Sequence, residues 1–357
     1  RIWLILARGM GTIVTKHPST QNAAVEKPSD EIQKGTDAVE ETSDEIQKGN
    51  DAVEETSDEI QKGNGGDEKP SDKMQKERWR SDKYREWNGE AVSKLRSKII
   101  RCIKRVEPLD QIQIIVCGGA SEGKSSLINN CLAAISGSYA NVADHGAGNE
   151  HVTKRYTVYK AWRRKNYQRK EIPLTFADTR GFSGSSTHGA SVAAVRACIA
   201  GKVGNKERMA SSITDCEWNE RIELKSKASY IFFVADATKI PDDGNLDSIE
   251  SHRTIYNNLR EIRRFSYEMD IRVAVFLTMC DKLDKEVYHD LCNLYYSKTV
   301  ERKVKAFSKM VDVPEERIFP IVNYSGKETE TNGMMMQMLI ALEQCVEDIT
   351  AMTLTAR

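Results

Sequence analysis

The sequence has no excess of either charge, no paired cysteines and no long apolar run. Its 53 Lys and Arg residues balance 53 Asp and Glu residues, so the overall charge predicts neither a nucleic-acid nor a membrane partner. Its eight cysteines have neither disulfide-like nor metal-ligand spacing, which predicts free thiols in the reducing cytoplasm. The apolar run at residues 2–7 is too short to cross a bilayer, so we expect no transmembrane segment there.

The N-terminal part of the chain carries an acidic repeat. The heptapeptide S-D-E-I-Q-K-G begins at Ser29, Ser43 and Ser57, with a step of 14 residues, and a degenerate copy begins at Ser71. Each heptad has one apolar residue, and Gly or Thr stands where a coiled coil needs a second one. Because so little apolar surface does not offset chain entropy, residues 1–76 are predicted to be a disordered acidic tail. A weak helix that forms on meeting a partner is the alternative.

Residues 77–357 are predicted to form one P-loop domain with a preceding helix. Apolar residues recur at helical spacing from Trp87 to Val106, and Pro108 ends that helix. Strands are expected at residues 111–117, 172–177, 230–235, 271–277 and 318–322, with an antiparallel edge strand at 156–161. Helices are expected near residues 124–134, 248–264, 285–310 and 334–352. This alternation predicts an α/β fold whose mainly parallel sheet has helices on both faces.

The sequence G-x-x-x-x-G-K-S at residues 118–125 follows the first apolar strand directly and opens a helix. This is the setting of a Walker A loop, in which backbone N–H groups and the helix N-terminus surround a phosphate chain. Lys124 is then expected to reach the β- and γ-phosphates, and Ser125 to ligate Mg²⁺.

A second predicted strand ends in D-x-x-G, from Asp178 to Gly181. Asp178 is expected to hold Mg²⁺ through water, and the backbone N–H of Gly181 to approach a γ-phosphate. Between the Walker A loop and this strand, Thr153 is our candidate for a Mg²⁺ ligand that senses the γ-phosphate. Thr157 lies in the same interval and stays an alternative.

The fourth strand runs into T-M-C-D-K-L-D, where a guanine-binding protein places a carboxylate for the base. Two registers fit imperfectly: one uses Thr278 with Asp281, the other Asp284. We prefer Asp281 because it lies closer to the strand end. Binding of adenine would leave this carboxylate buried without a hydrogen-bond partner, so the site would discriminate strongly in favour of guanine. After the last strand, Asn323, Tyr324 and Ser325 are expected to brace the base.

Taken together, these residues resemble the interferon-induced protein 44-like family of Ras-like (TRAFAC-type) GTP-binding proteins. The resemblance is carried by Trp79-Arg80, Trp87, residues 118–126, Asn129, residues 151–153, Asp178, residues 233–237, Ile240, residues 277–281 and residues 322–325. It implies a Ras-like G domain of the P-loop NTPase class, cytoplasmic nucleotide binding, an association with innate immune responses and an enzymatic activity that is often in doubt. This chain has Asp178-Thr179-Arg180-Gly181 where the family frequently has Asp-Ser-Leu-Gly, which favours a conformational switch.

Hydrolysis is expected to be slow. Efficient GTPases orient water with a Gln, commonly directly after the D-x-x-G glycine, and here that residue is Phe182. Self-association or a protein partner that supplies an Arg would raise the rate. Residues 181–227 are expected to contain the mobile switch, with a short helix at 191–199.

The predicted function is therefore a Mg²⁺-dependent guanine-nucleotide switch with low intrinsic GTPase activity. A pseudo-GTPase that recruits partners through the repeat tail and an ATP-binding P-loop protein are the alternatives. The residues expected to act in turnover are Lys124, Thr153 and Gly181. The residues expected to ligate Mg²⁺ are Ser125, Thr153 and Asp178. The residues expected to contact GTP or GDP are Gly118, Gly119, Ala120, Ser121, Glu122, Gly123, Lys124, Ser125, Ser126, Thr278, Asp281, Asn323, Tyr324 and Ser325.

Overall fold

The computed structural model describes residues 77–80, 86–106, 110–143, 155–165, 168–184, 189–209, 227–324 and 331–355. The tail predicted at residues 1–76 and the site candidates Thr153 and Ser325 lie outside these ranges. No helix within the described ranges is long and apolar enough to cross a membrane.

The described elements alternate between strands and helices. In chain order they are α1 (Gly89–Ile103), β1 (Ile112–Gly118), α2 (Lys124–Ser136), β2 (Thr157–Lys165), β3 (Gln168–Asp178), α3 (Val192–Ile199), β4 (Tyr230–Asp236), α4 (Glu250–Glu268), β5 (Arg272–Thr278), α5 (Lys285–His289), α6 (Lys298–Val311), β6 (Ile318–Pro320) and α7 (Asn332–Thr355). The strands form one sheet in the order β2-β3-β1-β4-β5-β6. Only the β2–β3 pair among these is antiparallel, which confirms the expected edge strand.

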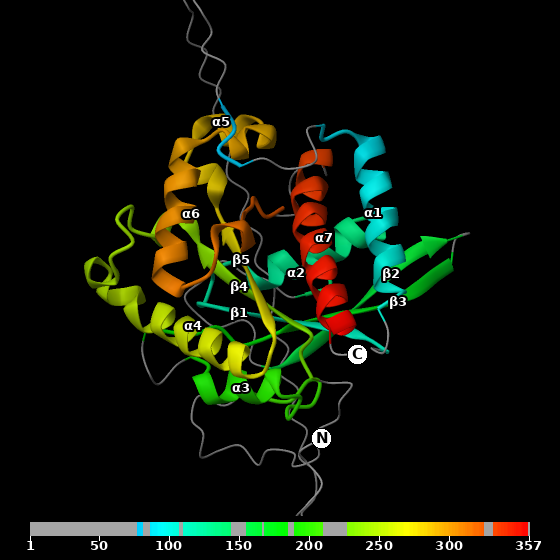
Figure 1. Ribbon diagram of the computed structural model, residues 1–357, viewed down its shortest axis with the longest axis horizontal. Helices are drawn as coiled ribbons and strands as arrows, with labels where there is room; N and C mark the ends of the chain where they lie inside the picture. Colours follow the sequence, from blue (N-terminus) through cyan, green and yellow to red (C-terminus); the bar gives the residue numbers. More distant parts are fainter. Residues whose placement is uncertain are drawn as a thin grey trace, which may run out of the picture. The chain divides into compact units, whose positions relative to one another are not determined.

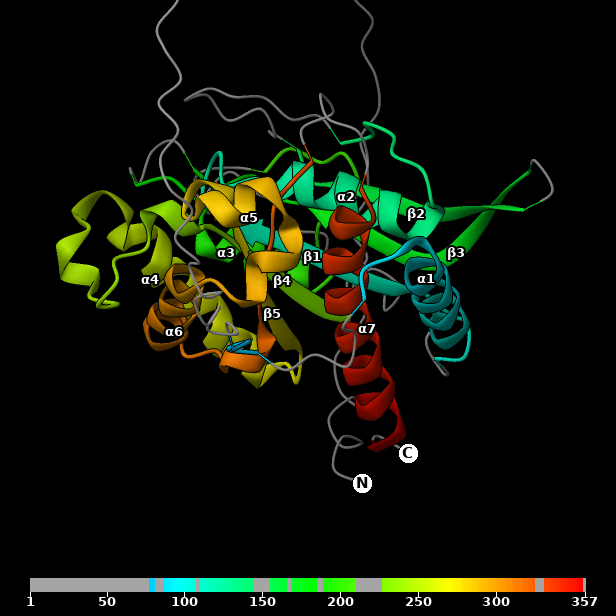
Figure 2. The same cartoon turned by 90° about the horizontal axis from the view of Figure 1, so that it is seen from above.

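Helices cover both faces of the sheet, as Figures 1 and 2 show. Side chains of a strand alternate between the faces, so neighbouring residues enter different cores. Ile115 and Phe233 pack with residues of α3, α4 and α6. Ile114 and Phe232 pack with residues of α1, α2 and α7. The buried, nearly continuous apolar strands follow from this double coverage, and the predicted P-loop α/β fold is confirmed.

One predicted helix is wrong in extent. Residues 285–310 form α5, a short 3₁₀ turn at Leu291–Tyr295 and α6 rather than a single helix. Three polar side chains cap these pieces: Asp284 accepts a hydrogen bond from the N–H of Glu286, Asp290 from that of Cys292, and Ser297 from that of Val300. Each cap satisfies backbone donors at a new helix start, so capping overrides the apolar periodicity.

The segment before α1 contacts the 3₁₀ turn that follows α5 and the first residue of β6. The Trp79 backbone N–H donates to the Tyr295 carbonyl at 3.0 Å, and the Trp79 ring meets the Tyr295 ring edge-on at 5.6 Å. Arg80 donates to the Ile318 carbonyl at 2.6 Å. These contacts hold residues 77–80 against a part of the domain that comes shortly after Asp281 and Asp284 in the sequence.

Candidate nucleotide-binding site

The Walker A residues form a tight loop between β1 and α2. Gly123 has φ +92°, a left-handed conformation that favours glycine, and α2 begins at the next residue. A Cβ on Gly118 would lie 2.2 Å from the Val234 carbonyl oxygen, so the strand pairing itself requires glycine there. The N-terminus of α2 therefore opens directly at the loop, and a helix N-terminus in this position is suited to receive a phosphate.

Lys124 is held inside the loop. Its side chain is buried, and Nζ donates to the Gly119 carbonyl at 2.7 Å. Burial lowers the pKa of Lys124, and the carboxylates of Asp178 and Glu122 oppose that shift. A bound phosphate would add negative charge next to the ammonium and so favour its charged form.

Two of the three predicted Mg²⁺ ligands meet. Ser125 Oγ donates to Asp178 Oδ2 at 2.7 Å, and both side chains are buried. The strand register explains this, because Asp178 pairs with Val116 two residues before the end of β1. A hydroxyl and a carboxylate are oxygen donors of the kind that Mg²⁺ takes, with water and phosphate completing its shell. Thr157 begins β2 opposite Asp178, so this alternative to Thr153 also lies at the same edge.

The D-x-x-G segment lies directly on the loop. The Phe182 N–H donates to the Gly118 carbonyl at 2.9 Å, and the Ala120 N–H donates to the Phe182 carbonyl at 2.8 Å. A Cβ on Gly181 would lie 2.7 Å from Ala120 Cα and 2.9 Å from Lys124 Nζ, so a side chain does not fit. The Phe182 ring is fully buried in the core and faces no water.

The predicted base-reading segment is tied to the loop through Thr278. Its buried hydroxyl donates to the Glu122 carbonyl at 2.9 Å, so Thr278 braces the loop rather than standing free for a base. Asp281 follows in a 3₁₀ turn at Cys280–Lys282 and makes no hydrogen bond or ion pair with residues that the structure describes. Asp284 instead caps α5 and accepts a hydrogen bond from Ser297 Oγ at 2.5 Å. Of the two candidates, Asp281 is therefore the one whose carboxylate bonds no residue in the described ranges.

Asn323 also supports the loop. Its Nδ2 donates to the Gly123 carbonyl at 3.2 Å, and its Oδ1 accepts from Asn130 Nδ2 at 2.9 Å. The next residue, Tyr324, meets the ring of Tyr139 edge-on with 4.6 Å between centroids. These two rings line a hollow with Asn130, Ala133, Met334 and Met335. Tyr139 was not anticipated from the sequence, although an aromatic residue just beyond the P-loop helix is a usable signal.

Glu122 is a buried acid inside the phosphate loop, and the sequence did not single out its carboxylate. Its side chain is 0% exposed, and Oε2 accepts from the Gly119 N–H at 2.6 Å. Oε1 has no hydrogen-bond partner among the described residues. Burial raises the pKa of Glu122 to about 7, while Lys124 acts to lower it. Burial therefore favours the neutral form of this carboxyl group well above the pH range in which an exposed Glu ionises.

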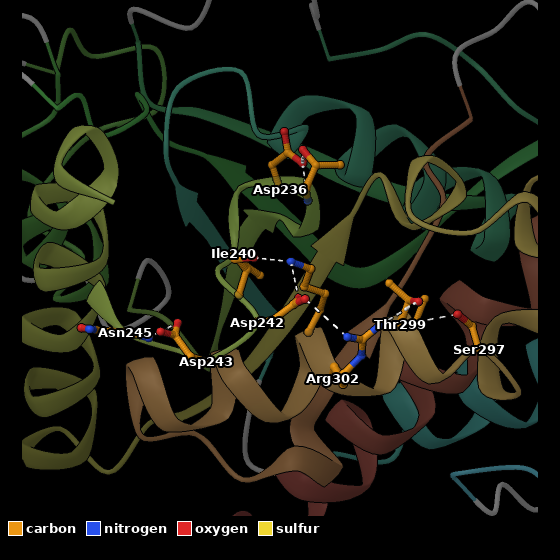
Figure 3. Close-up of polar contacts among 11 residues, drawn as sticks. Asp236, Ile240, Asp242, Asp243, Asn245, Ser297, Thr299 and Arg302 are labelled. Atoms are coloured by element: carbon orange, nitrogen blue, oxygen red, sulfur yellow. Dashed lines mark hydrogen bonds and ion pairs between the residues drawn. The ribbon is translucent and has the colours of Figure 1, made fainter. Parts of the chain in front are cut away.

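The residues directly after β4 are fixed by polar contacts of their own. Asp236 accepts from the Thr238 N–H and hydroxyl at 3.0 and 2.7 Å, and its carboxylate lies 3.6 Å from Lys239 Nζ. Figure 3 shows how this segment continues to Asp242, which pairs with Lys303 of α6 at 2.7 Å. Asp236 and Lys239 act on the Glu122 charge in opposite directions.

No protein-family model matches the chain. The chain is 21% identical to interferon-induced protein 44-like from Homo sapiens over 269 residues, which are 71% of this chain and 57% of that protein. It is 20% identical to interferon-induced protein 44 from Pan troglodytes over 275 residues, which are 73% of this chain and 60% of that protein. These relatives confirm the resemblance that the motifs carry, and the chain spans less than two thirds of their length.

Among solved structures, the chain is similar to a probable GTP-binding protein engB, with a TM-score of 0.36 and 14% identity over 67% of this chain and 99% of that one. It is also similar to Toc33 from Arabidopsis thaliana in complex with Mg²⁺ and GMPPNP, with a TM-score of 0.39 and 12% identity over 74% of this chain and 97% of that one.

Proposed function

We propose that this chain is a guanine-nucleotide-binding protein that acts as a Mg²⁺-dependent molecular switch with slow intrinsic GTP hydrolysis. The observation that carries the proposal is the convergence of three segments, at the ends of β3, β5 and β6, on one loop. Asp178 bonds Ser125, Phe182 bonds Gly118, Thr278 bonds the Glu122 carbonyl and Asn323 bonds the Gly123 carbonyl. A phosphate loop that is held by hydrogen bonds from three strand ends is preorganised, so less free energy is spent ordering it on binding.

Each residue has a defined part in the proposed site. Lys124 and the first amides of α2 hold the phosphates, and Ser125 with Asp178 holds Mg²⁺, which neutralises phosphate charge when bound. Asp281 accepts from the N–H groups of guanine. Tyr139 and Tyr324 flank the hollow beside Asn130 and limit where the base lies.

Slow turnover follows from Phe182. Its ring is buried and its backbone is bonded to the loop, so it does not orient an attacking water. The burial and backbone bonds of Phe182 are compatible with nucleotide binding without catalysis, so a pseudo-GTPase is the alternative function. A protein partner or self-association that supplies an Arg is the proposed route to faster hydrolysis.

The setting of the switch is proposed from two observations. The described cysteines are all free thiols, as expected in the reducing cytoplasm. The relatives are interferon-induced by name, so we place the chain in the innate immune response.

The substitution Asp281→Asn tests the proposed function, with selectivity between GTP and ATP as the readout. GTP affinity should fall by at least tenfold relative to the wild type while ATP affinity is unchanged, because an amide cannot accept both guanine N–H donors. Asp284→Asn is the matched control and should retain GTP selectivity. Equal affinity of the wild type for ATP and GTP would establish the ATP-binding alternative, and no binding of either would establish the pseudo-GTPase.

A further inference from the structure

The distal half of the β2–β3 hairpin is densely basic. Between Arg163 and Lys170 the sequence has five Lys and Arg residues and no Asp or Glu. Four of them form two successive cross-strand pairs, Arg163 with Lys170 and Arg164 with Arg169. We name these four residues the cationic ribbon. Figures 1 and 2 show this end of the hairpin extending beyond α1 and α7.

Folding alone does not account for this charge. Like charges directly opposite each other destabilise an antiparallel pair. Nearer the domain the hairpin avoids this, because Lys160 pairs with Glu171 at 3.2 Å. The four residues of the cationic ribbon make no ion pair with any residue in the described ranges. A partner of opposite charge would remove the repulsion, so the ribbon is suited to a polyanion.

Both faces of the ribbon are basic. Alternation along a strand places Arg163 and Lys170 on one face, and Arg164 and Arg169 on the other. On the second face the Arg169 guanidinium also lies 4.5 Å from the centroid of the Trp162 ring. A flat anionic bilayer would neutralise one face only. A groove with phosphates along both walls neutralises both.

The shape selects among nucleic acids. The major groove of B-form DNA admits a two-stranded β-ribbon, whereas the major groove of an A-form RNA duplex is too deep and narrow. We propose that the cationic ribbon binds duplex DNA by entering the major groove, with its four side chains on the phosphates of the two walls. This goes beyond the nucleotide switch and does not depend on it.

The overall charge balance conceals this surface. Residues 26–72 contain 16 of the 53 Asp and Glu residues and only five of the 53 Lys and Arg residues. The rest of the chain therefore carries a net charge of +11. Because the whole chain is neutral, DNA binding must depend on a local surface rather than on general attraction.

The test is fluorescence anisotropy of the full-length chain with a labelled B-form duplex of about 20 base pairs, titrated between about 50 and 200 mM salt. The variant R163Q/R164Q/R169Q/K170Q removes the four charges. We expect its log–log salt slope to be shallower by about 3 to 4, and its affinity at the lowest salt to fall by at least about tenfold.

The matched control is R101Q/K104Q/R105Q/R264Q, which removes four exposed basic side chains outside the hairpin and should keep the wild-type slope. The one-face variant R164Q/R169Q should lose about half of the slope change. Melting temperatures of the ribbon variants should stay close to that of the wild type, since relief of charge repulsion offsets the loss of the Arg169–Trp162 contact.

Three outcomes would overturn the proposal. The first is an equal loss of DNA affinity in the ribbon variant and the control. The second is wild-type binding to an A-form RNA duplex as tight as to DNA, which would show that groove entry is not used. The third is tighter binding to vesicles of anionic and neutral phospholipid than to DNA.

Discussion

Replacing the buried acid of the phosphate loop, Glu122→Gln, should change how stability depends on pH. The pKa of Glu122 is raised by burial from 4.5 to about 7 in the folded chain. A carboxyl whose folded pKa is raised binds its proton more tightly in the native state. Its protonated form is fully stabilising below pH 4.5, and that contribution is lost as the pH rises toward about 7. The shift corresponds to roughly 3 kcal/mol of unfolding free energy.

Glutamine stays neutral at every pH and keeps an oxygen that can accept from the Gly119 N–H. The variant should therefore lose less stability than the wild type between about pH 5 and 8, and gain up to about 3 kcal/mol relative to it at the upper end. Nucleotide affinity at about pH 8 should also rise, because one negative charge near the phosphates is removed.

The assay is urea denaturation of the wild type and the variant at a series of pH values, with the midpoint and slope analysed separately. Glu343→Gln is the control, because Glu343 is also buried but pairs with Lys98 at 2.5 Å. That variant should be less stable than the wild type at neutral pH. If Glu122→Gln and the wild type lose stability in parallel as the pH rises, the buried carboxyl does not titrate between pH 4.5 and about 7.

Three further substitutions test two contacts of the loop and the choice of Asp281 over Asp284. Gly181→Ala should cost about 1–3 kcal/mol of stability and weaken triphosphate binding more than diphosphate binding, because its Cβ would lie 2.7 Å from Ala120 Cα. The control is Gly89→Ala, where the nearest atom is 3.8 Å away, and equal melting temperatures of the two variants would refute the contact. Thr278→Val should cost about 1–3 kcal/mol, since it leaves the buried Glu122 carbonyl without its 2.9 Å donor; a loss no larger than that of the exposed Thr254→Val would contradict this. Asp284→Asn should weaken the cap of α5, which lowers the free energy of unfolding by up to about 1 kcal/mol, and should leave base selectivity unchanged. Altered selectivity would assign recognition of the base to Asp284.

Much of the fold was predictable because it depends on local patterns. Buried parallel strands give continuous apolar runs such as Ile112–Gly118, and the glycines of the P-loop mark the turn into α2. The order of the strands then places Asp178 and Thr278 at the same edge as Lys124. The meeting of Ser125 with Asp178 follows from that order and from the register of β3.

The remaining features depend on contacts between distant residues. Nothing in the sequence around Glu122 indicates that its side chain turns back onto the Gly119 N–H and is fully buried. Thr278 and Asn323 were expected at the base, yet their side chains bond the loop backbone. The split between α5 and α6 depended on caps that apolar periodicity does not report.

The most direct test of guanine-nucleotide binding is a titration of the full-length chain with fluorescent GTP, GDP and ATP analogues, with and without Mg²⁺. We predict saturable binding of the two guanine nucleotides, at least about tenfold weaker binding of ATP, and a loss of GTP affinity when Mg²⁺ is removed. Lys124→Ala should abolish the signal, since it removes the ammonium that holds the phosphates. Binding of GTP that does not respond to Mg²⁺, or that survives Lys124→Ala, would contradict a nucleotide site at residues 118–125.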